Sequence, residues 1–273
     1  MRMTHYRIKP DTQVNLHDYD TADTGDCKSK GEAAERTEHL RQTLDTLQER
    51  LYAEGSRAVL VVLQGLDAAG KDGTIRHVMS GVNPQGCIVT SFKTPTPLEM
   101  THDFLWRIHS RCPPHGCIGI FNRSHYEDVL ITRVHGVITG EQADRRLTEI
   151  CAFEKMLSNS GTRIVKFFLH MSEAEQKKRL LERLDTPEKR WKYNPQDVKE
   201  RVYWKAYQLA FEQALSVTST EQAPWFVVPA DHKWYRNLVV AEQLANVLND
   251  MDPKPPKCDG VDWDAARQSV SES

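Results

Sequence analysis

The chain is 273 residues long and carries 36 Lys and Arg against 38 Asp and Glu, so its formal net charge is −2. This near-neutral balance argues against a histone-like nucleic-acid coat, and the length is sufficient to bury a sizeable core. No apolar run approaches the roughly 20 residues of a membrane helix, the N-terminus lacks the apolar stretch of a secretory signal, and the six cysteines form no C-x-x-C motif. We therefore expect a cytoplasmic protein with reduced thiols and no membrane partner.

The first predicted element is a long helix that follows an irregular segment over residues 1–28. Ser29 and Glu32 have the spacing of a capping box, in which two side chains satisfy free N–H groups of the first turn. Leucines then recur at intervals of four, three and four, which places them on one helix face: Leu40, Leu44, Leu47 and Leu51. Gly55 is the expected end of this helix, because glycine readily adopts the left-handed conformation of a C-cap.

Five short runs of apolar and β-branched residues come next, separated by segments of helix length. Such runs are typical of strands buried on both faces of a parallel sheet. They lie at 58–63, 87–89, 117–121, 164–169 and 225–228. Strands that alternate with helices imply right-handed crossovers, so we expect a three-layer α/β domain with a parallel sheet of about five strands and helices on both faces. The domain is predicted to span 29–252, and the tail over 253–273 is expected to be disordered or loosely attached.

The first of these runs leads into a glycine-rich loop. The sequence GLDAAGK fits the pattern G-x-x-x-x-G-K between a strand and a helix. In this setting the glycines let backbone N–H groups point inward, the helix N-terminus adds partial positive charge, and the lysine reaches the phosphates. An ordinary strand-to-helix turn is the alternative interpretation. The residues predicted to bind phosphate or nucleotide here are Gly65, Ala68, Ala69, Gly70, Lys71, Asp72, Gly73 and Thr74.

Two features of this loop depart from the usual pattern. Asp72 stands where a serine or threonine normally holds Mg²⁺, and Thr74 lies two residues further on as a candidate substitute. Asp67 lies inside the loop, where a bare carboxylate would repel phosphate. Its presence is explained if it holds Mg²⁺, which bridges carboxylate and phosphoryl oxygens. A local cap of the loop amides is the alternative.

The third apolar run ends in Asn122 and Arg123, with Glu127 and Asp128 one helical turn later. Ligands of an open parallel sheet lie beyond the C-terminal strand ends, so this segment and the glycine-rich loop are expected to meet. A carboxylate is expected there to assist Mg²⁺, and since Asn122 is neutral, Glu127 or Asp128 would supply it. Arg123 has the planar, bidentate group that suits phosphoryl oxygens. A surface ion pair or a helix N-terminal charge is the alternative.

A basic helical hairpin is predicted between the fourth and fifth strands. Residues 177–205 carry ten Lys and Arg against five Asp and Glu, in a chain of net charge −2. Arg179 and Arg183 share one helix face, and Pro187 ends that helix before a second one begins. A lid over about 172–205 that carries cations across a phosphate site would exclude water and stabilise transferring charge. A solvated charged face is the alternative.

Together these stretches resemble the polyphosphate kinase 2 family. The matching sequences are VVLQGLDAAGKDGTI, GIFNRSHYEDVL, RLLERLDTPEKRWKYN and TSTEQAPWFVVPADHKWYRNL, and the likeness extends over nearly all of 30–250. The resemblance implies a P-loop kinase-like fold with a helical lid. It also implies Mg²⁺-dependent phosphoryl transfer between inorganic polyphosphate and adenine or guanine nucleotides, with Mn²⁺ as an alternative ion. A homodimer or homotetramer without a nucleic-acid partner is the implied assembly.

The resemblance also assigns roles to individual residues. The implied catalytic residues are Asp67, Lys71, Arg123 and Glu127, and Asp67 and Glu127 are the implied metal ligands. The implied polyphosphate channel and lid contain Lys93, Arg133, Arg179, Arg183, Lys189 and Lys192. Many members have Asp where this chain has Asn122, and Asn122 with Glu127 resembles the subgroup that phosphorylates both nucleoside mono- and diphosphates. Because an amide is neither charged nor basic, Asn122 is assigned to nucleotide binding rather than to metal or base chemistry.

Three other functions fit parts of the sequence. A nucleotide kinase of the same fold that uses ATP as donor would phosphorylate AMP without polyphosphate. A nucleotide- or polyanion-binding regulator would bind without turnover. A nucleic-acid binder could use the aromatic and basic lid, although the rest of the chain is neutral. Asp72 in place of Ser or Thr, and a lid richer in cations than one triphosphate requires, favour the polyphosphate interpretation.

Overall fold

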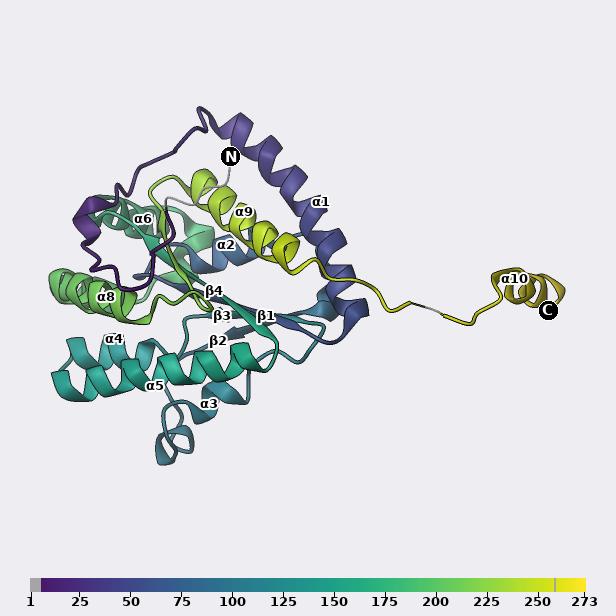
Figure 1. Ribbon diagram of the computed structural model, residues 1–273. Coiled ribbons are helices and arrows are strands. Elements are labelled where there is room, and N and C mark those ends of the chain that lie inside the picture. Colours follow the sequence, from purple (N-terminus) through teal and green to yellow (C-terminus); the bar gives the residue numbers. More distant parts are fainter. Residues whose placement is uncertain (1–5, 258) are drawn as a thin grey trace.

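The computed structural model describes residues 6–257 and 259–273. In this part of the chain, five strands form one sheet in the order β2-β3-β1-β4-β5 (Figure 1). The strands are β1 (Ala58–Gln64), β2 (Cys87–Ser91), β3 (Ile118–Asn122), β4 (Thr162–His170) and β5 (Trp225–Pro229). Neighbouring strands all pair in parallel, which confirms the predicted α/β class.

The place of each strand in the sheet explains its burial. Every residue of the central strand β1 is buried, as the apolar run predicts. The edge strand β2 departs from the prediction, because Ile88 and Val89 are exposed. A strand with a neighbour on one side only has less to cover it, so burial on both faces was the wrong expectation for β2.

Helices cover both faces of the sheet, as predicted (Figure 1). One core contains side chains of α1 (Lys30–Glu54), α2 (Lys71–Val78) and α9 (Lys233–Met251). The other contains side chains of α3 (Trp106–His109), α4 (Glu127–Val134), α5 (Gly140–Asn159) and α8 (Trp204–Thr218). The chain runs from β1 to the edge strand β2, returns to β3, and then crosses to β4 on the other side of β1. This reversal places a crevice beyond the C-terminal end of β1, where ligands bind in open α/β sheets.

Helix α1 begins and ends where the sequence predicts. The Ser29 hydroxyl accepts a hydrogen bond from the Glu32 N–H (3.2 Å). The Glu32 carboxylate accepts from the Lys28 N–H (3.0 Å), one residue before the position that a capping box would use. Gly55 ends the helix with φ +64°. Leu44, Leu47 and Leu51 are buried in the first core, while Leu40 is partly buried beside them.

Residues 6–28, the described part of the N-terminal segment, have little regular structure, as expected, but they are packed against the domain. A short 3₁₀ turn, η2 (Leu16–Asp18), interrupts the segment, and Arg7 forms an isolated antiparallel bridge with Phe226. Ile8, Val14 and Leu16 are buried in the second core. The segment therefore closes the β5 side of the sheet and is part of the folded body.

The predicted basic hairpin is a series of short helical pieces. These are α6 (Glu173–Asp185), η5 (Pro187–Lys192), α7 (Pro195–Glu200) and η6 (Arg201–Tyr203), and they lead into α8. Two further 3₁₀ turns, η3 (Pro84–Gly86) and η4 (Glu99–Thr101), flank β2. Helix α6 begins three residues after β4, so the hairpin rises from the C-terminal ends of the strands.

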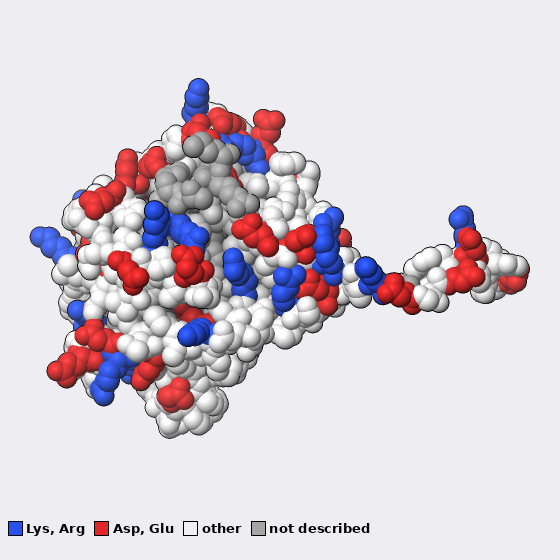
Figure 2. Space-filling view, viewed as in Figure 1, with Lys and Arg blue, Asp and Glu red and all other residues white. Residues whose placement is uncertain are grey.

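The C-terminal tail extends away from the body (Figure 1). The tail is expected to be disordered or loosely attached, and within it residues Trp263–Glu272 form α10, which the Asp262 carboxylate caps by accepting from the N–H groups of Asp264 and Ala265. Trp263 and Val270 are exposed on this helix. Among the described residues, no helix combines the length and the apolar character needed to span a bilayer. On the face drawn in Figure 2, acidic and basic side chains are interspersed rather than separated by sign.

Candidate active site

The glycine-rich loop joins β1 to α2 and is a tightly curled segment. Gly65 has φ +152° and Gly70 has φ +103°, and Ala68 also adopts a left-handed φ of +67°. A Cβ atom on Gly70 would lie 2.1 Å from a guanidinium nitrogen of Arg236. Glycine is therefore needed at position 70 for both conformation and space, as a phosphate-binding loop requires.

The loop presents backbone donors and a lysine to one place. The first helical hydrogen bond of α2 runs from the Thr74 N–H to the Gly70 carbonyl (2.9 Å), so the N–H groups of residues 71–73 precede the helical ladder. Lys71 is buried and donates to the carbonyl oxygens of Gly65 (2.6 Å) and Leu66 (3.4 Å). Burial, together with the neighbouring charge of Arg123, lowers the pKa of Lys71. An anion bound at this helix terminus would relieve that desolvation.

Arg123 lies at the end of β3 and joins the two predicted metal ligands. Its guanidinium donates to Asp67 Oδ1 (2.6 Å) and to Glu127 Oε2 (3.4 Å). Burial acts to lower the pKa of Arg123, but the carboxylates of Glu127 and Asp67 outweigh it and raise that pKa. The predicted meeting of the loop with the third strand end is thus confirmed.

Asn122 and Asp72 contact each other across the same strand ends. The Asn122 amide N–H donates to Asp72 Oδ1. Asn122 is buried, whereas Asp72 is exposed and reaches the strand end from the first turn of α2. An amide at position 122 therefore lets a carboxylate sit next to it without like-charge repulsion.

A cavity of about 890 Å³ opens over this centre and continues under the basic hairpin. Asp67, Lys71, Asn122, Arg123 and Glu127 line it. It also contains most of the predicted lid and channel cations, namely Lys93, Arg179, Arg183, Lys189 and Lys192. The sequence prediction of a basic lid above a phosphate loop is consistent with this arrangement.

Three predicted residues have other surroundings. Thr74 is fully buried and its hydroxyl donates to Asn237 Oδ1 (3.4 Å), so it points away from the phosphate loop and is no substitute for a metal-binding hydroxyl. Ala69 is also fully buried, and its N–H donates a hydrogen bond to the Leu66 carbonyl (3.1 Å). Arg133 lies on α4 outside the lining of the cavity, one turn beyond Leu130 on a helix whose cavity-facing side ends at Ile131.

Arg179 lines the cavity, but its guanidinium is hydrogen-bonded to backbone carbonyl groups of the protein. It is 5% exposed and donates to the carbonyl oxygens of Ala68 (3.1 Å) and Ala69 (3.0 Å), as well as to those of Ala230 (2.5 Å) and Asp231 (2.9 Å). A guanidinium with these partners fixes the back of the phosphate loop rather than forming part of a polyanion channel. Arg183, one turn later on the same face of α6, pairs instead with Asp197 (3.0 Å).

Several residues of the site received no role from the sequence. Arg236 of α9 is 3% exposed and donates to the Ala69 carbonyl (2.8 Å), and burial beside Arg179 lowers its pKa to about 9. Asp197 faces Asp67 across the cavity, and burial together with Asp67 raises its pKa. Gln64 donates to Glu127 Oε1 (2.9 Å) when its amide is oriented to satisfy its neighbours. The stretch HKWYRNL, within the family resemblance, is the signal that could have drawn attention to Arg236.

The donor set suits a hard divalent cation. Asp67 and Glu127 bring carboxylate oxygens from two different strand ends to one guanidinium, so their charges converge on one point. Mg²⁺ is usually held by one or two carboxylates together with substrate phosphates, rather than by a full protein cage. Two carboxylates next to a phosphate-binding helix terminus fit that pattern.

Known proteins resemble the chain over nearly its whole length. A family model described as polyphosphate kinase 2 (PPK2) matches residues 27–256. A protein of Meiothermus ruber named AMP/ADP-polyphosphate phosphotransferase is 48% identical over 256 residues, covering 93% of this chain and 96% of the relative. An ADP-polyphosphate phosphotransferase of Rhodopseudomonas palustris is 43% identical, covering 94% and 93%. The crystal structure of polyphosphate kinase 2 from Arthrobacter aurescens superposes with a TM-score of 0.95 at 43% identity, covering 98% of this chain and 96% of that one.

Proposed function

The chain belongs to the polyphosphate kinase 2 family, and from this premise we propose that it phosphorylates AMP to ADP and ADP to ATP with inorganic polyphosphate as donor. The observation that carries the proposal is the cavity in which the phosphate loop, Arg123 and the lid cations converge. Phosphoryl transfer requires in-line placement of two phosphates and neutralisation of charge, and little covalent chemistry from the protein. The same residues serve the reverse reaction.

The loop and the strand end have separate tasks. The N–H groups of 71–73 and the Lys71 ammonium bind the phosphate that lies against α2, because they are preorganised donors at a helix N-terminus. Arg123 contributes its guanidinium to the equatorial oxygens of the transferring group, where its planar fork can make two hydrogen bonds. Losing one such donor typically costs about 3–4 kcal/mol of transition-state stabilisation.

Asp67 and Glu127 are the residues that would hold Mg²⁺. The bound ion would neutralise phosphate charge and orient the reacting oxygens. In the described structure the Arg123 guanidinium occupies the space between these carboxylates. Arg123 must therefore exchange carboxylate partners for phosphate partners when substrates bind.

The lid supplies the path for the polymer. Lys93, Lys189 and Lys192 line the cavity and are exposed, so their ammonium groups are available to a polyanion. Arg183 also lines the cavity and forms an ion pair with Asp197 (3.0 Å). Because these charges face solvent, polyphosphate binding is expected to weaken with added salt.

The acceptor range follows from position 122 and from the relatives. The Meiothermus ruber relative is named for both AMP and ADP, whereas the Rhodopseudomonas palustris relative is named for ADP. The amide of Asn122, bonded to Asp72, leaves the acceptor side of the cavity without an extra negative charge. AMP, with one phosphate, and ADP, with two, can then bind through the same hydrogen-bond donors of the protein. Guanine nucleotides are proposed as further acceptors.

Location and assembly complete the proposal. The five described cysteines are free thiols, which supports a reducing compartment such as the cytoplasm. A homodimer or homotetramer is proposed from family membership. Light scattering on a size-exclusion column tests the assembly directly, because a monomer mass would exclude both.

A phosphorylation assay tests the function. AMP, ADP, GMP and GDP are each incubated with Mg²⁺ or Mn²⁺ and with either polyphosphate or ATP as donor, and the products are separated by chromatography. ADP and ATP formed from AMP with polyphosphate alone are the expected result. ATP formed only from ADP would refute the dual acceptor range. Product from AMP with ATP but not with polyphosphate would favour an ordinary nucleotide kinase, and binding without product would favour a regulator.

A further inference from the structure

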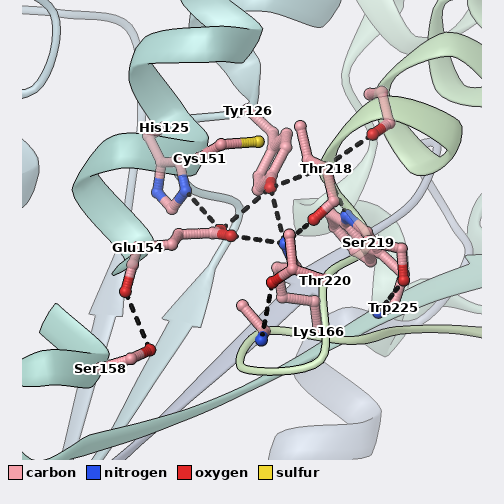
Figure 3. Close-up of polar contacts among 12 residues, drawn as sticks. His125, Tyr126, Cys151, Glu154, Ser158, Lys166, Thr218, Ser219, Thr220 and Trp225 are labelled. Carbon is pink, nitrogen blue, oxygen red and sulfur yellow. Dashed lines mark hydrogen bonds and ion pairs between the residues drawn. The ribbon is translucent and has the colours of Figure 1, made fainter. Parts of the chain in front are cut away.

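A buried ion pair between Lys166 and Glu154 lies next to His125 and Tyr126, which follow the end of β3 (Figure 3). Lys166 of β4 and Glu154 of α5 are 0% and 2% exposed, and their Nζ and Oε2 atoms are 2.5 Å apart. Lys166 Nζ lies 5.4 Å and 5.2 Å from the ring centroids of Tyr126 and Trp225, two aromatic residues of the second core. Neither Lys166 nor Glu154 lines the cavity of the candidate active site.

Each polar atom of this pair has partners. Lys166 Nζ also donates to the Tyr126 hydroxyl (2.9 Å) and to the Thr218 carbonyl (2.7 Å). Glu154 Oε1 accepts from the Tyr126 hydroxyl (2.9 Å) and faces His125 Nε2 (3.2 Å). Burial acts to raise the pKa of Glu154, but Lys166 and His125 outweigh it and lower that pKa, so the carboxylate stays charged.

Stability alone is a poor reason for such a pair. Removing two charges from water costs several kcal/mol per ion, and replacing a buried ion pair with apolar residues is often neutral or stabilising. What apolar side chains could not do is hold His125 and Tyr126 by directed hydrogen bonds.

His125 and Tyr126 are among the residues between Arg123 and Glu127. Arg123 has φ +62°, a left-handed conformation that costs a non-glycine residue about 1–3 kcal/mol and persists only where the surroundings impose it. The chain must turn after Arg123 so that the Arg123 guanidinium reaches Asp67 (2.6 Å). The first turn of α4 then brings Glu127 to the same guanidinium (3.4 Å). An anchor on His125 and Tyr126, two of the three intervening residues, can impose this turn.

We propose that Lys166 and Glu154 are positioning residues, which hold Arg123 and Glu127 over the phosphate loop through Tyr126 and His125. They touch neither substrate nor metal. The anchor is made of two elements, β4 and α5, that belong to the rigid body of the domain. Because a displacement of about 1 Å in a reacting group can cost a hundredfold in rate, a loose anchor should lower turnover without unfolding the protein. The inference rests on the roles given to Arg123 and Glu127 in the proposed function.

The principal test replaces both charges at once. The double variant Glu154→Gln/Lys166→Met leaves no unpaired buried charge, so it is expected to fold. We expect its kcat for AMP phosphorylation by polyphosphate to fall by about 10- to 100-fold while both KM values stay within about twofold. A kcat equal to that of the wild type, in folded protein, would overturn the proposal.

A matched control separates positioning from general loss of stability. Arg57 and Glu54 form an ion pair (2.6 Å) next to the N-terminal end of β1, the end of the sheet opposite the phosphate loop. The variant Arg57→Met/Glu54→Gln should change the thermal midpoint but not kcat. If both double variants lower kcat alike, the effect comes from stability, and the proposal fails.

A variant cycle tests the route of transmission. If Lys166 and Glu154 act through Arg123 and Glu127, their double replacement should add little to the loss of kcat that Arg123→Ala/Glu127→Gln causes alone. Losses that multiply would show independent effects and refute the route. Tyr126→Phe removes one hydroxyl and leaves the ion pair in place, so it remains testable even if the double variant fails to fold. It should lower kcat about three- to tenfold with unchanged KM, and an unchanged kcat would contradict the anchor.

The proposed function and this inference can fail separately. Turnover of the wild type with polyphosphate tests the proposed function. The ratio of the kcat of each variant to the kcat of the wild type tests the positioning role of Lys166 and Glu154. If the wild type used ATP instead of polyphosphate, the same ratios would be measured with ATP as donor.

Discussion

Replacing Asn122 with Asp tests whether its amide is needed beside Asp72. In the wild type the amide donates to Asp72 Oδ1, so Asn122→Asp would bring two carboxylates into contact at the strand ends. Two unit charges about 3 Å apart repel by roughly 5 kcal/mol at an effective dielectric constant of 20. Because Asp72 is exposed and its charge is partly screened, we expect about 2–3 kcal/mol.

The same repulsion makes the loss depend on pH. Like-charge repulsion from Asp72 raises the pKa of the introduced carboxyl in the folded chain above its pKa in the unfolded chain. Since the folded pKa is the higher one, stability relative to the wild type is retained at pH values below the unfolded pKa and is lost as the pH rises through the folded pKa. At low pH the introduced carboxyl is protonated and can again donate a hydrogen bond to Asp72.

Urea or thermal unfolding with a chelator present, at pH 4.5 and pH 8, measures the effect against the wild type at each pH. We expect a deficit of about 2–3 kcal/mol at pH 8, equivalent to roughly 5–10 °C in the midpoint, and a much smaller deficit at pH 4.5. Adding Asp72→Asn to the variant exchanges the roles of amide and carboxylate and should restore most of the loss. An equal deficit at both pH values, or no recovery in the double variant, would refute the reasoning.

Three further predictions concern the loop, the core and the lid. Lys71→Met should lower kcat by about 10²- to 10³-fold with an unchanged thermal midpoint, because a preorganised donor is lost and no buried charge is left unpaired; a kcat within twofold of the wild type would remove Lys71 from the mechanism. Gly119→Ala should lower the free energy of unfolding by about 1–3 kcal/mol, because the added Cβ would lie 2.9 Å from three atoms of the Pro113 ring. An unchanged free energy of unfolding in chemical denaturation would contradict that contact. Lys189→Gln/Lys192→Gln should raise the KM for polyphosphate at low salt and flatten its salt dependence while the KM for AMP is unchanged, since both ammonium groups face the cavity from the lid. A salt dependence as steep as that of the wild type would exclude these lysines from the channel.

Local chemistry explains what could be predicted from the residues. The hydroxyl of Ser29 and the left-handed Gly55 set the limits of α1, because caps act within one turn of the chain. Four of the five runs of β-branched residues became strands buried on both faces, as a parallel sheet requires, and the fifth became the edge strand β2. The glycine-rich loop followed from Gly65 and Gly70, whose positive φ angles other residues rarely adopt.

Long-range contacts explain what could not be predicted. Arg179 and Arg183 share a helix face, as their spacing requires, yet Arg179 faces four backbone carbonyl groups while Arg183 faces the cavity. The spacing of residues along α6 contains no information about how deep each one lies against the loop and β5. Thr74 illustrates the same limit, because its hydroxyl meets Asn237 of a helix 163 positions away.

Periodicity, capping and short motifs are local properties of the chain, and they were enough to predict the α/β class, the order of the elements and the phosphate loop. The family was predicted from the resemblance of longer stretches. The packed structure was needed to show which cations remain available to a polyanion. It also showed that Asn122 contacts Asp72 and that Arg123 lies between two carboxylates. It also revealed the buried pair of Lys166 and Glu154. These relations depend on the direction and depth of side chains brought together from separate elements, and those quantities exist only after the sheet and its helices have packed.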